Sequence, residues 1–251
     1  MLDALKRLFG RAAPTPGATA AAVPLAPTGE LPFPHLLVPG KAALSTWQEL
    51  HGKGLGYPLL MGEHKELHLL LENRERSEDS TAAILAAAAT VDLAAWEQER
   101  VAADPEYYRL PPAEQAIGEV LPFATTALGA HLDVLTRRPK REVVIGLLPV
   151  TESWEVPAWL KIGGWNECPP PEIHVVLFRH WEHQYGARVA SVTGDVIEFT
   201  VERPPVTDTD AMALARQQYV YCPDIVDQGV ETVANLAASL KGAKVWFFWW
   251  D

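Results

Sequence analysis

The chain has 251 residues, of which 48% are hydrophobic, so it can bury one sizeable core or two modest ones without disulfides or metals. Its formal charge of -11 would repel a phosphate backbone, and we therefore expect no nucleic-acid partner. The two cysteines, Cys168 and Cys222, are too few for a disulfide scaffold or a four-thiolate zinc site. This cysteine usage favours a reducing, cytoplasmic environment.

Residues 1–30 are predicted to be a disordered tether. Beyond Arg11 the segment consists mostly of Ala, Pro, Thr and Gly, and such a composition cannot offset the entropy of ordering. The opening "MLDALKRLFGR" lacks the continuous apolar core of a signal peptide, and no apolar run in the chain approaches membrane-spanning length. We therefore expect no stable membrane insertion, and we interpret the short leucine stripe as a fraying terminus.

A mixed, helix-rich N-terminal α/β lobe is predicted over residues 31–136. Apolar residues at helical spacing before "HGKGLG" predict a helix near 43–50, and "YPLLMG" predicts a short strand. Pro58 places that strand at a sheet edge or makes the proline one of its first residues. The alanine-rich segment 80–103 predicts one long helix.

The basic run "TRRPKRE" separates this lobe from a predicted C-terminal α+β domain over residues 142–251. In chain order its patterns indicate a buried strand, a helix ending at Gly186, a hairpin around Gly194, a broken helix and a final apolar strand, "VWFFWW". This order is that of a ferredoxin-like split βαββαβ layout, in which helices cover one face of an antiparallel sheet.

A long insertion, residues 151–171, follows the first strand of this layout. Loops of this length inside a compact domain are uncommon and are often functional. The insertion carries Trp154, Trp159 and Trp165, which either fill a core or form a recognition surface. The sequence leaves both alternatives open.

Three segments are similar to a known family: "GGWNECPPPEIHVVLFRHWEHQYGA", "YVYCPDIVDQG" and the terminal "WFFWWD". They resemble the bacterial DUF4253 family, a domain of unknown function, and "ALSTWQELHGKGLGYPLLMG" resembles that family's N-terminal part. The resemblance implies a bacterial origin. It implies no activity, substrate or catalytic residue.

Cys222 is a candidate nucleophile, because a thiol at a helix boundary can lose its proton when Asp and His groups lie nearby. It also continues the apolar face of the preceding helix, which Pro223 must end. We favour this second interpretation, since no histidine accompanies the cysteine in a recognisable motif. Asp224 and Asp227 could hold a hard cation or act as acid and base, yet capping of the next helix by Asp227 is the favoured role.

His180 and His183 are weak metal candidates, three positions apart on one predicted helix, while His174 points elsewhere around the helix axis. A third ligand, such as Glu167 or Cys168, would have to come from the insertion. The sequence contains no P-loop and no dinucleotide fingerprint, so no cofactor is predicted.

The leading hypothesis is a binding module that contacts a protein partner through the 151–171 insertion and the 219–229 loop. The residues expected to make these contacts are Trp165, Asn166, Glu167, Cys168, Tyr221 and Gln228. The alternative is an enzyme or metal-binding protein that uses Cys222, Asp224, Asp227 and a nearby histidine. The sequence does not decide between them.

Overall fold

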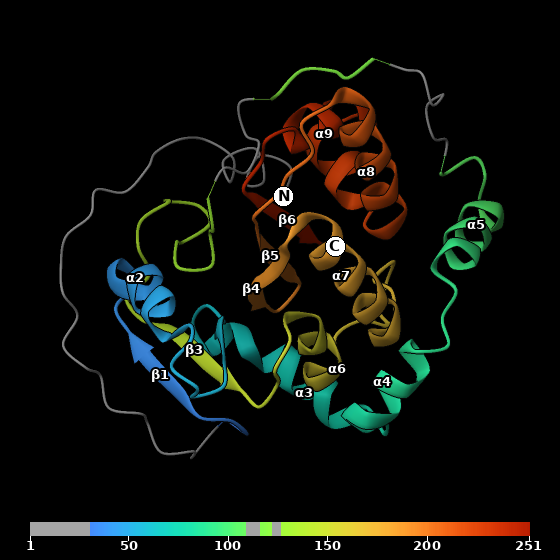
Figure 1. The fold of residues 1–251 in the computed structure, drawn as a ribbon. Coiled ribbons are helices and arrows are strands. Elements are labelled where there is room, and N and C mark those ends of the chain that lie inside the picture. Colours follow the sequence, from blue (N-terminus) through green and yellow to red (C-terminus); the bar gives the residue numbers. More distant parts are fainter. Residues whose placement is uncertain (1–30, 109–115, 122–126) are drawn as a thin grey trace.

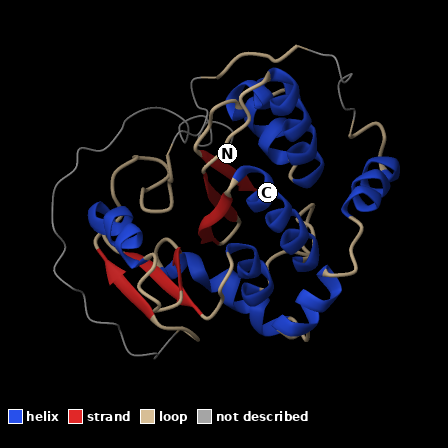
Figure 2. Cartoon of the chain, viewed as in Figure 1, coloured by secondary structure: helices blue, strands red, loops and turns tan. Residues whose placement is uncertain are grey.

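The structure, a computed structural model, describes residues 31–108, 116–121 and 127–251. Its centre is a mixed sheet in the order β1-β3-β2-β4-β5-β6. The strands are β1 (His35–Val38), β2 (Tyr57–Leu60), β3 (Val143–Leu148), β4 (Ala187–Thr193), β5 (Val196–Val201) and β6 (Val245–Trp249). Helices pack on the sheet (Figures 1 and 2), and the expected α+β class is confirmed.

The strand order differs from the ferredoxin-like layout, which is not confirmed. β3 does not pair with the other C-terminal strands; it lies antiparallel between β1 and β2. β2 in turn meets β4 in parallel through a single register pair, Leu60 and Ser191, and β4, β5 and β6 continue as an antiparallel meander. One sheet therefore extends across the predicted boundary at 136–142, because β3 is completed by strands that precede it in the chain.

One face of the sheet is covered by α2 (Gly40–Leu50), as the apolar spacing predicts. Trp47 anchors this helix, because its indole Nε1 donates a hydrogen bond to the carbonyl of Pro58 at 3.0 Å. Pro58 is the second residue of β2, so the expectation that it is among the first residues of the strand is correct.

The opposite face carries the larger core. The remaining helical segments are η1 (His64–Leu67), α3 (His68–Arg76), α4 (Thr81–Ala88), α5 (Leu93–Ala103), η2 (Ser153–Glu155), α6 (Val156–Leu160), α7 (Pro171–Tyr185), α8 (Asp208–Tyr221), η3 (Ile225–Val230) and α9 (Val233–Leu240). The buried residues of α4 form a separate small cluster with Ala158 of α6 and Val175 of α7. In Figure 1, α7 crosses the C-terminal strands, while α5 stands at the edge of the molecule. None of the residues of α5 is buried, so this helix is held from one side only.

The prediction of one long helix over 80–103 is wrong, since the segment divides into α4 and α5. The break has a local cause. Thr90 donates its hydroxyl to the carbonyl of Ala87 at 2.8 Å, and the Asp92 carboxylate accepts from the backbone N–H groups of Ala94 and Ala95. Asp92 is therefore the N-cap of a new helix, which the alanine pattern alone does not reveal.

The 151–171 insertion is not an irregular loop, because it folds into η2, α6 and a short bridge between Trp165 and Cys168. Trp159 is 9% exposed and packs edge-to-face on Phe33, with ring centroids 5.4 Å apart. Trp154 is half-buried under the guanidinium of Arg179. These two tryptophans fill the core, and Trp165 remains partly exposed.

The helix break at Cys222 is confirmed: α8 ends at Tyr221, and Pro223 follows its C-cap. The chain then makes a π-helical turn, η3, before α9 begins. The expected cap is wrong, because Asp227 lies inside this turn and the hydroxyl of Thr232 caps α9 by accepting from Asn235 N–H at 3.0 Å.

The last strand, β6, lies at the sheet edge but is well covered. Trp246 and Phe248 face α7, where the Trp181 ring stacks on Phe248 at 5.4 Å, while Phe247 and Trp249 pack together at 5.5 Å. Successive side chains of β6 therefore point to opposite faces of the sheet. The predicted tether, residues 1–30, lies outside the described residues, and no helix in the described part of the chain is long and apolar enough to cross a membrane.

Candidate functional site

The insertion and the C-terminus lie together, although they are far apart in the sequence. Trp165 packs edge-to-face on Trp250 with centroids 6.2 Å apart, and the Asn166 side-chain amide donates to the carbonyl of Asp251 at 2.8 Å. Asp224, in the loop after α8, accepts from the backbone N–H of Asp251 at 2.9 Å. The two segments that we predicted as a binding surface are thus joined through the last residues of the chain.

Arg100 of α5 contacts both the insertion and the end of α8. Its guanidinium donates to the carbonyl of Val220 at 2.8 Å and to the carbonyl of Glu167 at 2.7 Å, and it forms an ion pair with the Glu167 carboxylate at 3.0 Å. The Tyr108 ring lies 5.5 Å from the guanidinium carbon. Because Arg100 holds both the insertion and the end of α8, it fixes α5 against the body of the protein.

A buried polar chain runs beneath the insertion, through Cys168, His174 and Tyr221. The Cys168 sulfur lies 3.5 Å from His174 Nε2, and His174 Nδ1 lies 2.7 Å from the Tyr221 hydroxyl. Burial lowers the pKa of His174 to about 3 and raises the pKa of the Cys168 thiol. Both groups are therefore neutral at pH 7, which is the reverse of an activated thiolate–imidazolium pair.

The two ring nitrogens of His174 are both engaged inside the core. Nε2 lies against the Cys168 sulfur and Nδ1 against the Tyr221 hydroxyl, so the three side chains satisfy one another's buried polar groups.

Cys222 lies in the core at the end of α8. It is fully buried, and its thiol donates to the carbonyl of Trp249 at 3.0 Å. Burial is the largest cause that raises the pKa of this thiol well above its usual value. The structure therefore gives Cys222 the surroundings of a core residue.

The remaining loop residues are held by local hydrogen bonds. Gln228 donates to Asp224 at 3.0 Å, and Asp227 accepts from the Tyr219 hydroxyl at 3.3 Å. Partial burial raises the pKa of Asp227. His180 and His183 both lie on exposed parts of α7. Among the described residues no group of three or more His, Cys, Asp or Glu side chains is arranged to hold a metal ion.

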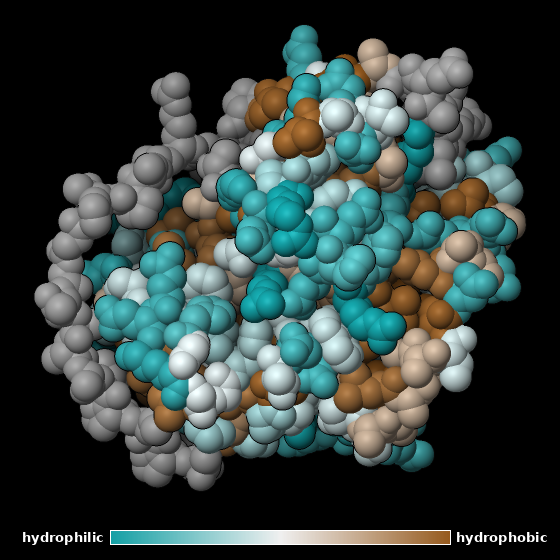
Figure 3. Space-filling model, in the orientation of Figure 1, coloured by the Kyte–Doolittle hydropathy of each residue, from teal (hydrophilic) through white to brown (hydrophobic). Residues whose placement is uncertain are grey.

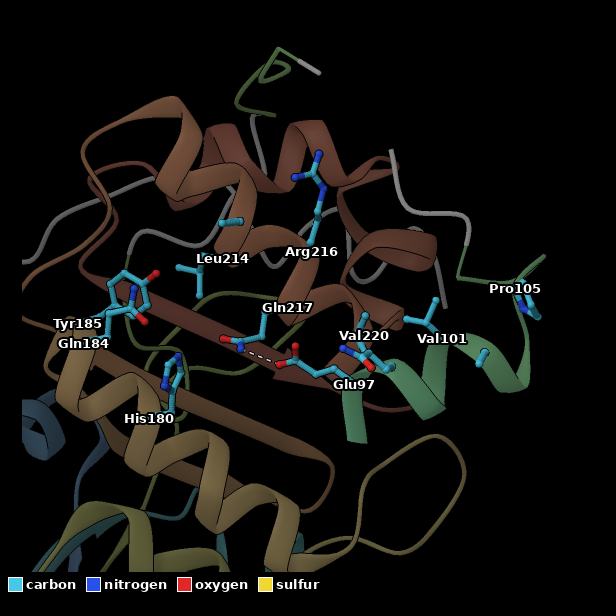
Figure 4. A pocket seen from close by; sticks show the side chains of 13 residues that line it. Glu97, Val101, Pro105, His180, Gln184, Tyr185, Leu214, Arg216, Gln217 and Val220 are labelled. Carbon is cyan, nitrogen blue, oxygen red and sulfur yellow. Dashed lines mark hydrogen bonds between the residues drawn. The ribbon is translucent and has the colours of Figure 1, made fainter. Parts of the chain in front are cut away.

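A groove of about 640 Å³ lies between α5, α7 and α8. Figure 3 shows apolar surface on the face of the molecule where α5 meets its body, and Figure 4 shows the groove from close by. Its apolar wall includes Val101, Leu214 and Val220. The polar and charged residues that line it are Glu97, Gln98, His180, Gln184, Tyr185, Arg216 and Gln217.

Two hydrogen bonds fix the polar centre of this groove. The buried indole of Trp181 donates to Gln217 Oε1 at 2.6 Å. Gln217 Nε2 in turn donates to Glu97 Oε1 at 2.7 Å, the bond that is dashed in Figure 4. The first bond determines which end of the amide faces Glu97, because an indole N–H only donates. Trp181 is 0% exposed, so the indole that holds the Gln217 amide is itself fixed by the core.

Residues 144–251 match the model of a domain of unknown function, DUF4253. The C-terminal part of the chain is therefore similar to the DUF4253 family. No curated protein and no solved structure matches the chain. The resemblance predicted from the three sequence segments is confirmed.

The DUF4253 segment contains the whole Cys168–His174–Tyr221 chain but only part of the groove. It supplies the walls made by α7 and α8, including His180, Leu214 and Gln217. The wall made by α5, with Glu97 and Val101, precedes the matched residues. The groove therefore forms where the DUF4253 segment meets the N-terminal part of the chain.

Sequence reasoning missed most of the groove. Among its lining residues, His180 was a candidate for a metal site, and Val220 falls within the predicted 219–229 loop. Glu97 and Gln217 belong to ordinary polar faces of helices and are 120 positions apart in the sequence. One sequence feature was informative: the segment that forms α5 has too few apolar residues for a fully buried helix, which indicates a helix at the surface.

Proposed function

We propose that the protein binds a small organic molecule with an apolar body in the groove between α5, α7 and α8. The observation that carries this proposal is the groove itself. Its volume of about 640 Å³ lies within the roughly 300–1,000 Å³ range of small-molecule sites, and a mainly apolar wall surrounds a few polar groups. This combination of size and lining is typical of a site that orients a ligand through one polar contact.

The fixed orientation of Gln217 supports the proposal. A polar group that is already held before binding loses little side-chain entropy when a ligand arrives. Trp181 and Glu97 hold the Gln217 amide from both ends. The groove thus has a rigid polar centre between apolar walls.

The hypothesis of a protein partner at the insertion stays a prediction, with less support than the groove. Trp154 and Trp159 pack inward, and Glu167 is engaged by Arg100. Trp165 and Asn166 remain at the surface for such a contact. A bacterial origin and a cytoplasmic location also stay predictions, based on the family resemblance and on the low cysteine content.

A solvatochromic dye tests the groove directly. Nile red is neutral and fluoresces strongly only in apolar surroundings. Ala102 lines the groove on α5, whereas its neighbour Ala103 is exposed and does not line it. We expect Nile red to fluoresce with the wild-type protein and with Ala103→Trp, and to lose most of this signal with Ala102→Trp, because the indole fills the groove.

Thermal unfolding of both variants provides the control for folding. The proposal fails if the dye shows no enhanced fluorescence with the wild-type protein, or if the two folded tryptophan variants bind it equally.

A further inference from the structure

Glu97 is the charged group at the centre of the groove. It is half-buried, and burial raises the pKa of its carboxyl, while the hydrogen bond from Gln217 offsets part of this effect. A carboxylate removed from water without a positive partner is unfavourable, and a neutral amide compensates it only partly.

The basic groups of the groove do not supply that partner. The Arg216 side chain points away from Glu97 in Figure 4. Partial burial and the nearby His183 lower the pKa of His180, so its imidazole is mainly neutral at pH 7. The chain as a whole carries a formal charge of -11, which favours the approach of a cation.

The apolar walls lie on both sides of this carboxylate. Val101 and Val220 line one end of the groove, and Leu214 and the ring of Tyr185 line the other (Figure 4). A ligand that fits must therefore combine an apolar body with one group that is complementary to Glu97.

We infer that the ligand of the groove is an amphiphilic organic cation, a protonated amine with an apolar body, whose ammonium group pairs with Glu97. This inference rests on the proposed function and adds the ligand class. The ammonium donates to the carboxylate oxygen that Gln217 leaves available, and the apolar body covers Val101 and Val220.

Three probes of matched shape test the charge: 4-phenylbutylamine, 4-phenylbutanol and 4-phenylbutanoate. Isothermal titration of the full chain at pH 7 should rank them with the amine tightest and the carboxylate weakest. We expect the amine to bind about tenfold more tightly than the alcohol, since one hydrogen bond to a charged group is worth about this factor.

Glu97→Gln should remove the preference for the amine over the alcohol, because the neutral amide cannot pair with an ammonium group as a carboxylate does. Glu99→Gln is the matched control, because Glu99 is exposed on the same helix and does not line the groove. We expect it to bind all three probes as the wild type does.

The outcomes separate the two proposals. If none of the probes binds, the groove is not a ligand site and both proposals fail. If the alcohol binds as tightly as the amine, or the carboxylate binds best, or Glu97→Gln keeps the preference for the amine, the groove stands and the cation inference is wrong.

Discussion

At the scale of single residues, the surroundings of the two cysteines distinguish a catalytic thiol from a structural one. Cys168 is 4% exposed and Cys222 is 0% exposed, and burial raises the pKa of both thiols. Since the thiolate is the reactive form, we expect iodoacetamide to label neither residue quickly in the folded protein at pH 7.5.

The measurement is mass spectrometry of labelled peptides over time, with the unfolded chain in urea as the positive control. Both thiols should react there at the rate of free cysteine. Fast and selective labelling of Cys168 in the folded state would revive the enzyme hypothesis at the His174 chain, and fast labelling of Cys222 would revive it at the loop after α8.

Glu198 on β5 is a buried carboxyl that contributes to the pH dependence of stability. It is 1% exposed and accepts from the backbone N–H groups of Gly129 at 2.6 Å and Ala130 at 3.1 Å. Burial raises its pKa in spite of these bonds. For an acid whose folded pKa is raised, the folded state holds the proton more tightly than the unfolded state does. Its stabilising contribution is therefore full below the unfolded pKa and decreases as the pH rises through the folded pKa.

Urea unfolding of the wild type and of Glu198→Gln from pH 4 to pH 8 tests this sign. We expect the free energy of unfolding of the wild type to fall with rising pH relative to that of the variant. Glu49→Gln, on an exposed position of α2, should follow the wild type at every pH. A difference between wild type and Glu198→Gln that does not change with pH would contradict the raised pKa.

At the scale of elements, the segment between α8 and α9 shows that the sequence predicts where one helix ends but not where the next begins. Pro223 predicts where α8 ends, because the residue before a proline is disfavoured in a helix. The next helix start cannot be chosen so easily, since Asp224, Asp227 and Thr232 are all cap-forming residues. The π-helical turn of η3 moves the start of α9 to Val233 and so selects Thr232.

Other parts of the fold also separate into features that the sequence predicts and features that it does not. Strands and helices with strong apolar periodicity, such as α2, α7 and the β4–β5 hairpin, follow from the sequence because each buries one face. The strand order does not, because the position of β3 between β1 and β2 depends on pairings across long stretches of chain. The groove is harder still, since it forms between helices that the sequence does not relate.

Thr232→Ala tests the cap assignment. Loss of a hydroxyl cap costs about 1 kcal/mol, so we expect the free energy of unfolding to fall by about this amount in urea titrations. Asp227→Ala should cost less, because the Tyr219 hydroxyl keeps an alternative acceptor, the carbonyl of Tyr107 at 3.1 Å. If Asp227→Ala proves the more damaging of the two, the sequence-based cap was the better assignment.

At the scale of the whole molecule, β3 joins the two parts of the chain. All six residues of β3 are buried, and its neighbours on both sides, β1 and β2, come from the N-terminal part. The family match begins inside this strand, at residue 144. The segment 142–251, which we predicted as a C-terminal domain, thus contains a strand whose partners lie outside it.

We therefore expect the fragment 142–251 to be insoluble when it is expressed alone, while the fragment 31–251 melts within a few degrees of the full chain. Removing β1 and β2 leaves both edges of an apolar strand unpaired, and such edges favour aggregation. It also removes α2, which covers Val143, Ile145 and Leu147 on one face of β3. Residues 1–30 supply none of these contacts in the sequence-based interpretation, since their composition cannot support a core. The measurements are soluble yield, analytical ultracentrifugation and thermal unfolding of both fragments beside the full chain. A monomeric 142–251 fragment that unfolds cooperatively would show that the C-terminal part folds independently and that β1 and β2 only extend its sheet.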